Sequence, residues 1–72
     1  MVYAFEFLKY VDGRAEPVVG ETTTRFFSND QAARAHALRV LPRVAVGGVF
    51  GCRVVREDNV FVTLIISGAS GD

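Results

Sequence analysis

The sequence predicts an α+β fold, in which an antiparallel sheet of about four strands (ββαββ) carries one helix packed on one face. Residues 2–11 and 60–66 are rich in the aromatic and β-branched side chains that favour strands. Residues 29–41 are rich in Ala, Leu and Arg, which favour helices. A chain of 72 residues is one domain, which we place at residues 1–66, and the Gly- and Ser-rich residues 67–72 are predicted to form a flexible tail.

The first part of the chain predicts two antiparallel strands. The first three aromatic side chains of residues 2–11 occupy alternate positions, so they share one face of a strand. Asp12-Gly13 predicts a turn, because Gly adopts positive φ at no steric cost. Residues 14–20 are expected to form an extended loop, since Pro17 is unsuited to a central strand. The Thr-rich residues 21–27 predict a second, less buried strand, at an edge or half exposed.

The helix has sequence signals at both ends. Ser28 is predicted to be the N-cap, and Gln31, three residues later, completes a capping-box pattern. Asp30 in the first turn suits the positive end of the helix dipole. Pro42 is expected to end the helix, because the residue before a proline disfavours helical geometry.

The apolar side chains of the predicted helix fall on one broad arc when residues are placed about 100° apart. This arc should face the sheet, and its alanines allow a close approach. Arg34 interrupts the arc, so its aliphatic stem is expected to lie along the edge of the core. The arc contains Ala33, Ala37, Leu38, Val40 and Leu41, whereas Gln31, His36 and Arg39 lie on the opposite side.

The last part of the chain predicts a hairpin. Gly47-Gly48 is a connector, and residues 49–56 and 60–66 are strands joined around residues 57–59, which tolerate turn geometry. The preferred two-residue loop places Arg53 near Leu64 and Val55 opposite Val62. A three-residue loop would shift the register and turn one face over.

The strand at residues 60–66 is apolar on both faces. Alternation points Val60, Val62, Leu64 and Ile66 one way and Phe61 and Ile65 the other. One helix covers one face, so we expect a second copy of the chain to cover the other face or an edge. A core this small is usually reinforced by disulfides, a metal or assembly, and a lone cysteine excludes an internal disulfide. We therefore expect a homo-oligomer, with a dimer favoured, that associates through Phe61, Val62, Leu64, Ile65 and Ile66.

The basic residues are unevenly distributed in a chain of zero net charge. Residues 31–56 contain no acid but several arginines, which suit planar recognition of phosphate or carboxylate. Solvated arginines, with ion pairs to the acidic first part of the chain, would explain the same pattern. The neutral charge also argues against nucleic acid as a partner. The candidate anion or nucleic-acid contacts are Arg34, Arg39, Arg43, Arg53 and Arg56.

No catalytic, cofactor or metal site is predicted. His36 has no carboxylate or nucleophile at helical neighbour positions, and we expect it at the surface or in an interface. Cys52 lies in an apolar strand and is expected to be a buried, inert thiol. The Gly-rich residues 47–51 resemble a phosphate loop only superficially, because a strand rather than a helix should follow them. A connector or a bulge at Gly51 is the better interpretation.

The compartment and membrane status follow from the same residues. No charged segment followed by an apolar one opens the sequence, as a signal peptide would. The longest uncharged apolar stretch, residues 44–52, is far shorter than the ~20 residues of a membrane helix. With one unpaired cysteine, a cytoplasmic protein with no membrane partner is expected.

The order strand–strand–helix–strand–strand carries a resemblance. The opening Tyr-Ala-Phe-Glu-Phe strand, the turn at Asp12-Gly13 and the helical Gln-Ala-Ala-Arg-Ala-His-Ala-Leu of residues 31–38 resemble a family of short uncharacterised bacterial proteins. The resemblance covers most of the chain, although the long, Thr-rich second strand departs from the family. It implies the same topology, and it implies nothing about function because the family has no known activity.

These observations predict a non-enzymatic module that associates with itself or with another protein. The alternative is a small-ligand or nucleic-acid binder that uses an interface cavity or the Arg-rich surface of the helix and hairpin. A dry, well-packed interface would favour the first class, and an ordered ligand in an interface cleft would favour the second.

Overall fold

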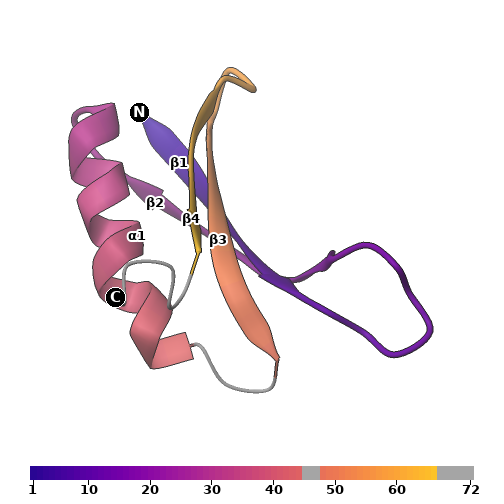
Figure 1. Cartoon of the computed structure of the whole chain (residues 1–72). Coiled ribbons are helices and arrows are strands. Elements are labelled where there is room, and N and C mark those ends of the chain that lie inside the picture. Colours follow the sequence, from indigo (N-terminus) through magenta and orange to yellow (C-terminus); the bar gives the residue numbers. More distant parts are fainter. Residues whose placement is uncertain (45–47, 67–72) are drawn as a thin grey trace.

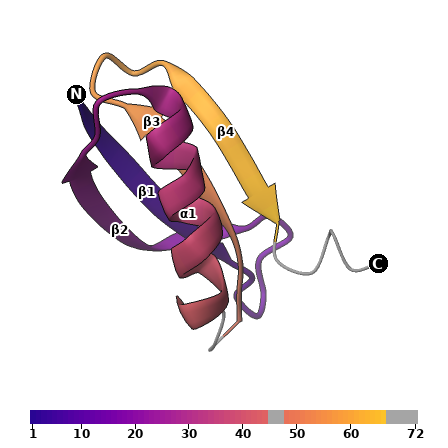
Figure 2. The same cartoon turned by 90° about the vertical axis from the view of Figure 1, so that its left-hand side faces the viewer.

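The computed structural model of the chain describes residues 1–44 and 48–66. In these residues the order of elements is β1 (Val2–Lys9), β2 (Val18–Phe26), α1 (Asp30–Val44), β3 (Val49–Arg56) and β4 (Phe61–Ile66). The strands form one antiparallel sheet in the order β2-β1-β3-β4, and α1 lies across one face (Figures 1 and 2). The predicted α+β fold and ββαββ order are confirmed. The predicted tail at 67–72 and the Gly47 part of the connector lie outside the described residues.

The core lies between α1 and the face of the sheet that it covers, here called the inner face. β1 is a central strand, so its alternate aromatic side chains are enclosed by neighbouring strands as well as by the helix. Alanines on α1 let the helix approach these rings closely. The buried core consists of Tyr3, Phe5, Phe7, Ala33, Ala37, Leu41, Cys52 and Val54.

The start of α1 differs from the prediction by one residue. The side chain of Asn29, not that of Ser28, is the cap: its Oδ1 accepts a hydrogen bond from the backbone N–H of Ala32 at 2.8 Å. Both side chains suit an N-cap, and the choice depends on where the chain leaves β2. The backbone N–H of Phe27 donates to the carbonyl of Met1 at 2.9 Å, which keeps the chain in the sheet until just before Ser28.

The last residue of α1 and the side chains that it buries also differ from the prediction. Pro42 lies inside the last turn and the helix continues to Val44, so the proline does not end the helix where the sequence predicts. Ala33, Ala37 and Leu41 face the sheet as predicted. Leu38 is exposed and His36 is half-buried, whereas the reverse was expected. On the helical wheel these two lie about 100° to either side of Ala37, so the rotation of the helix about its own axis decides which one is covered.

β2 is the exposed edge strand that its composition predicts. It begins directly after Pro17, at Val18, three residues earlier than expected, since at an edge a proline next to the strand costs no hydrogen bond of the ladder. The pairing with β1 shifts register between Phe7 and Leu8, which leaves Gly20 without a partner on β1. All of β2 beyond its first residue is exposed.

The Gly-rich start of β3 contains a bulge, one residue before the predicted position at Gly51. Register with β1 shifts so that Phe50 has no partner between Val49 and Gly51. A Cβ atom on Gly51 would lie 3.0 Å from the carbonyl oxygen of Ile65 on the neighbouring strand. Glycine is needed here because the backbones approach too closely for a side chain.

The β3–β4 hairpin has a three-residue loop, so the preferred two-residue loop is wrong. The N–H of Asn59 donates to the carbonyl of Arg56 at 2.8 Å, and the N–H of Arg56 donates to that of Val60 at 2.9 Å. Asn59 has a φ of 66°, a conformation that asparagine adopts more easily than most residues. A bulge at Val62 of β4, which has no partner on β3, then shifts the register back between Val54 and Val55.

The bulge mixes the two predicted registers. Arg53 lies opposite Leu64, as predicted, but Val55 lies opposite Phe61 rather than Val62. Cross-strand partners share a face, so Phe61 joins Leu64 on the side of the sheet away from α1.

Candidate functional site

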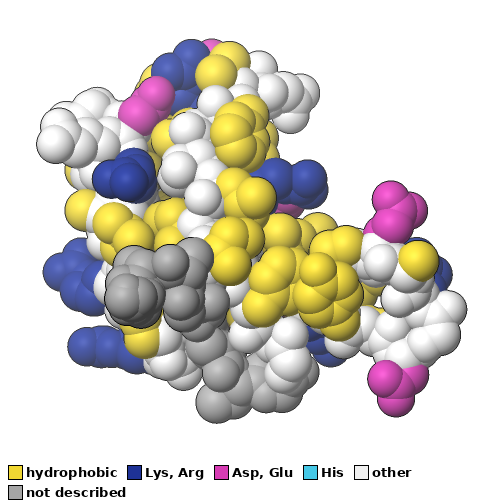
Figure 3. Space-filling model, in the orientation of Figure 1, with side chains coloured by type: hydrophobic (Ala, Val, Ile, Leu, Met, Phe, Trp, Pro, Cys, Tyr) yellow, Lys and Arg dark blue, Asp and Glu magenta, His cyan; other side chains and the backbone are white. Residues whose placement is uncertain are grey.

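The sheet face away from α1, here called the outer face, carries exposed hydrophobic side chains. Phe26 at one edge is 67% exposed, and Phe61 and Leu64 at the other edge are 58% and 47% exposed. Figure 3 looks onto the β4 edge of the sheet, with α1 on the left, and shows hydrophobic side chains gathered over β4. Partner residues in the ladder place Val2, Leu8, Val19, Phe26, Val55, Phe61, Leu64 and Ile66 on this face.

A charged pair lies near the centre of the outer face. Glu6 of β1 is opposite Arg53 of β3, which is opposite Leu64 of β4. The Nε and Nη2 atoms of Arg53 both lie 2.5 Å from Oε1 of Glu6. The centre of the face therefore carries two opposite charges, with Leu64 of β4 on one side and Thr22 of β2 on the other.

The structure separates the residues predicted for self-association. Phe61, Leu64 and Ile66 lie on the outer face and are exposed. Val62 and Ile65 instead pack against the core under α1. Alternation correctly predicts that Leu64 and Ile65 face opposite ways, but the bulge at Val62 was not visible in the sequence.

The structure also separates the five candidate arginines. Arg53 is neutralised by Glu6 on the outer face. Arg56 is held among acids at the end of the sheet where α1 begins. Only Arg34, Arg39 and Arg43 remain together, along α1, and all three are exposed. The predicted helix-and-hairpin Arg surface is therefore not continuous.

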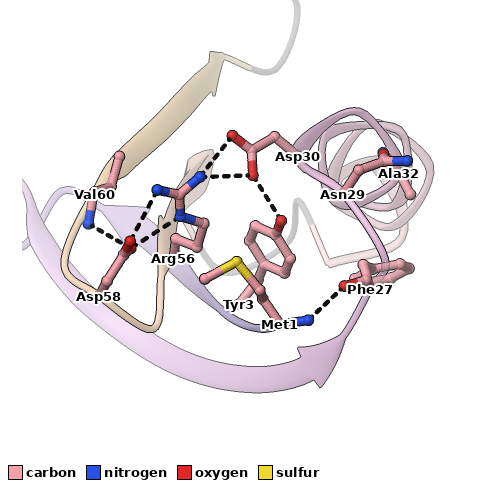
Figure 4. Close-up of polar contacts among 9 residues, drawn as sticks. All are labelled: Met1, Tyr3, Phe27, Asn29, Asp30, Ala32, Arg56, Asp58 and Val60. Atoms are coloured by element: carbon pink, nitrogen blue, oxygen red, sulfur yellow. Dashed lines mark hydrogen bonds and ion pairs between the residues drawn. The ribbon is translucent and has the colours of Figure 1, made fainter.

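The acids around Arg56 form a network that joins three elements (Figure 4). Its Nε and Nη2 each lie 2.9 Å from an oxygen of Asp58, and its Nη1 lies 3.4 Å from Oδ2 of Asp30. The hydroxyl of Tyr3 donates to Oδ1 of Asp30 at 2.6 Å. This bond, together with burial, raises the pKa of Tyr3, while Arg56 lowers the pKa of Asp58. The network connects the start of α1 to β1 and to the β3–β4 turn. Its charged groups are already paired with one another.

A depression of about 390 Å³ lies between β2 and α1. It exists because α1 packs over β1, β3 and β4, so the helix leaves the inner side of β2 uncovered. Arg25 of β2 lines one side, and His36, Arg39, Val40 and Arg43 of α1 line the other. Sequence reasoning missed Arg25 and the position of His36. The pairing of Arg25 with Tyr3 would have placed it on the inner face, but that register was not predicted.

His36 packs against aromatic rings at the floor of this depression. Its ring centroid lies 5.1 Å from that of Phe5 and 5.0 Å from that of Phe27. The guanidinium carbon of Arg25 lies 5.8 Å from the centroid of the Phe27 ring. Burial, together with the charges of Arg25 and Arg39, lowers the pKa of His36. The imidazole is therefore neutral near pH 7 and adds no charge to the three arginines around it.

Cys52 is fully buried, as predicted. Burial, with a contribution from the nearby charge of Glu6, raises the pKa of its thiol to about 11. A thiol with this pKa forms very little thiolate near neutral pH, so it is a poor nucleophile.

Searches for a metal site, a membrane helix and related proteins add no functional assignment. Among residues 1–44 and 48–66, no group of three or more His, Cys, Asp or Glu side chains could hold a metal ion. No helix in this part of the chain is long and apolar enough to cross a membrane. Comparisons with protein families, curated proteins and solved structures found no match. The resemblance to short bacterial proteins therefore stays a prediction.

Proposed function

We propose that this chain is a small non-enzymatic module that associates with a second copy of itself through the outer face of its sheet. The observation that carries the proposal is the exposure of Phe26, Phe61 and Leu64 on one face of a small domain. Several large exposed hydrophobic side chains on one face, gathered near its two edges around a polar centre, mark an interaction surface rather than ordinary surface scatter. The buried thiol of Cys52 suits a reducing compartment, which supports the cytoplasm as the location.

The dimensions of the molecule suit a sheet-on-sheet dimer. The Cα trace extends 37 Å by 27 Å in its two longer dimensions and 16 Å in the third. A molecule of this thin shape offers the whole sheet face to a partner, and a stable interface of standard size buries roughly 800 Å² per partner. Two such sheets would pack about 10 Å apart with their strands nearly aligned.

The charges at the centre of the face favour a second copy as the partner. A two-fold interface brings the same patch of both subunits together, so it must be complementary to itself. A patch that contains Glu6 and Arg53 meets this condition, because each charge can approach its opposite in the other subunit. The existing pair also lowers the cost of removing both charges from water.

Leu64→Glu tests this proposal against a matched control, Leu38→Glu. Both leucines are 47% exposed, but Leu64 is on the outer face and Leu38 is on the helix. Light scattering coupled to size exclusion should give a dimer mass for the unmodified chain and for Leu38→Glu at micromolar concentration. Leu64→Glu should shift the mass to that of a monomer, while circular dichroism confirms that it is folded.

Two results would overturn the proposal. One is a monomer mass for the unmodified chain that does not change on concentrating. The other is a dimer that Leu38→Glu dissociates and Leu64→Glu leaves intact, which would place the interface on the helix side.

A further inference from the structure

The depression between β2 and α1 gathers positive charge that nothing in the described residues neutralises. Arg25, Arg39 and Arg43 line it, and none of them is within 4.0 Å of an acid in the described part of the chain. Glu21 is the acid on the same side of β2, opposite Phe7, but it does not line the depression. Three like charges held together repel one another, and a bound anion would relieve that repulsion.

The side chains are arranged on two separate elements. Arg25 is placed over the ring of Phe27, at 5.8 Å from its centroid, while Arg39 and Arg43 project from the helix one turn apart. The backbone amides in this half of α1 are already used inside the helix, so the guanidinium groups must supply the contacts. Guanidinium groups bind phosphate through pairs of parallel hydrogen bonds.

We propose that the depression lined by Arg25, His36, Arg39 and Arg43 binds the phosphate group of a small phosphorylated compound. Its volume of about 390 Å³ is within the range of small-molecule sites. A phosphate dianion matches several arginines better than a single carboxylate does, because it offers more charge and more acceptor oxygens. Val40 gives the site an apolar wall for the rest of the ligand. This surface is on the helix side of the molecule, so the site is independent of the proposed dimer face.

The distribution of the arginines favours a compact ligand over a nucleic-acid strand. A strand needs a basic track that follows several phosphates. Here Arg53 is paired with Glu6 on the opposite face, and Arg56 is occupied by acids. The chain as a whole has no net charge. The available charge is thus concentrated at one place.

His36 provides the measurement, because it is the only histidine in the chain and it lines the depression. We expect its ring resonances in the NMR spectrum to shift saturably when inorganic phosphate or glycerol 3-phosphate is added to the full chain. Sodium chloride at matched ionic strength should give no saturable shift. Arg39→Gln and Arg25→Gln should each weaken binding by roughly threefold to tenfold, as expected for the net loss of one hydrogen bond at a solvent-exposed site.

Arg34→Gln is the matched control, because Arg34 is on the same helix but does not line the depression. The proposal predicts that this variant binds phosphate as the unmodified chain does. It is overturned if neither phosphate compound gives a saturable shift, or if Arg34→Gln weakens binding as much as Arg39→Gln. It is also overturned if a short single-stranded RNA binds while both phosphate compounds do not, since that would indicate an extended polyanion site.

Discussion

The two faces of the sheet are built from the same strands, but within residues 1–44 and 48–66 only one is covered by a helix. On the inner face Tyr3, Phe5 and Val54 are fully buried beneath α1. On the outer face Phe61 and Leu64 remain about half exposed. The inner face is aromatic and faces small alanines, so the helix can come close. The outer face mixes apolar side chains with a central charged pair, and no element of the described residues covers it.

This difference shows that hydrophobicity alone does not decide burial. Strand alternation sorts side chains into two sets, and both sets here are largely apolar. What distinguishes the sets is the partner within the chain, since one helix can cover only one face of a sheet. A face with exposed apolar side chains that no described element covers is the basis for expecting a partner outside the chain.

Phe5→Ala against Leu64→Ala is the largest expected contrast between the faces. Removing the buried Phe5 ring should cost about 3–5 kcal/mol, which is comparable to the net stability, roughly 3–5 kcal/mol, of a core this small. We expect Phe5→Ala to be largely unfolded by circular dichroism. Leu64→Ala should cost about 1 kcal/mol or less in the monomer. A urea midpoint for Phe5→Ala equal to that of the unmodified chain would contradict the assignment of the inner face as the core.

Gly51→Ala tests the close approach of the β3 and β4 backbones. The new methyl group would lie 3.0 Å from the Ile65 carbonyl oxygen, and backbone cannot move away easily. We expect a loss of about 1–3 kcal/mol in urea unfolding, as for other overpacked sites. Gly20→Ala is the control, because its nearest atoms are in the flexible side chain of Lys9. Equal losses in the two variants would show that the close approach of β3 and β4 is not the cause.

Asn29→Ala tests how much the N-cap contributes to the stability of α1, the helix that covers the inner face. Loss of the hydrogen bond to the Ala32 N–H should cost about 0.5–2 kcal/mol. Ser28→Ala should be nearly neutral, because the Asn29 side chain is the cap. Thermal unfolding of both variants measures the difference. A larger loss for Ser28→Ala would move the start of the helix back to the position that the sequence predicts.

The smallest expected effect is the pH dependence that His36 gives to the inner face. Its pKa is lowered from 6.5 in the folded chain by burial and by Arg25 and Arg39, while Phe5 and Phe27 carry no charge. The unfolded chain therefore binds more protons below pH 6.5, and stability falls as pH drops from 6.5 to the folded pKa. Asp58, whose pKa is lowered from 3.8 by Arg56, loses its contribution only in more acid solution.

Urea unfolding in phosphate-free buffer at several pH values measures this slope. His36→Gln should be less stable at every pH, because it loses ring contacts, but it should lack the slope just below pH 6.5. A slope that persists unchanged in His36→Gln would assign it to another group.

The sequence predicts the elements of this fold better than it predicts their pairing. β3 has the predicted bounds, because its composition and flanking turns define it locally. The hairpin register depends on whether Glu57 belongs to the loop and on the bulge at Val62, which are settled by packing on both faces at once. A strand that is apolar on both faces does not by itself reveal a shift by one residue.

The candidate sites show the same limit. Arg39 and Arg43 were both predicted as anion contacts because they belong to the acid-free, Arg-rich residues 31–56. Arg25 was missed because it comes from a distant strand, and only the pairing of β1 with β2 brings it to the helix. His36 was predicted on the polar side of the helix because the sequence does not determine how α1 is rotated about its own axis over the sheet.

The irregularities at both sides of the sheet have a consequence for assembly size. The pairing of β2 with β1 and that of β4 with β3 each contain a register shift. Such interruptions twist and bend an edge strand, so a further strand cannot easily continue the ladder. Growth by edge-to-edge addition, which leads to fibrils, is therefore hindered at both ends. Association through the outer face, as proposed above, together with interrupted edge strands suits a closed particle of defined size rather than an open polymer.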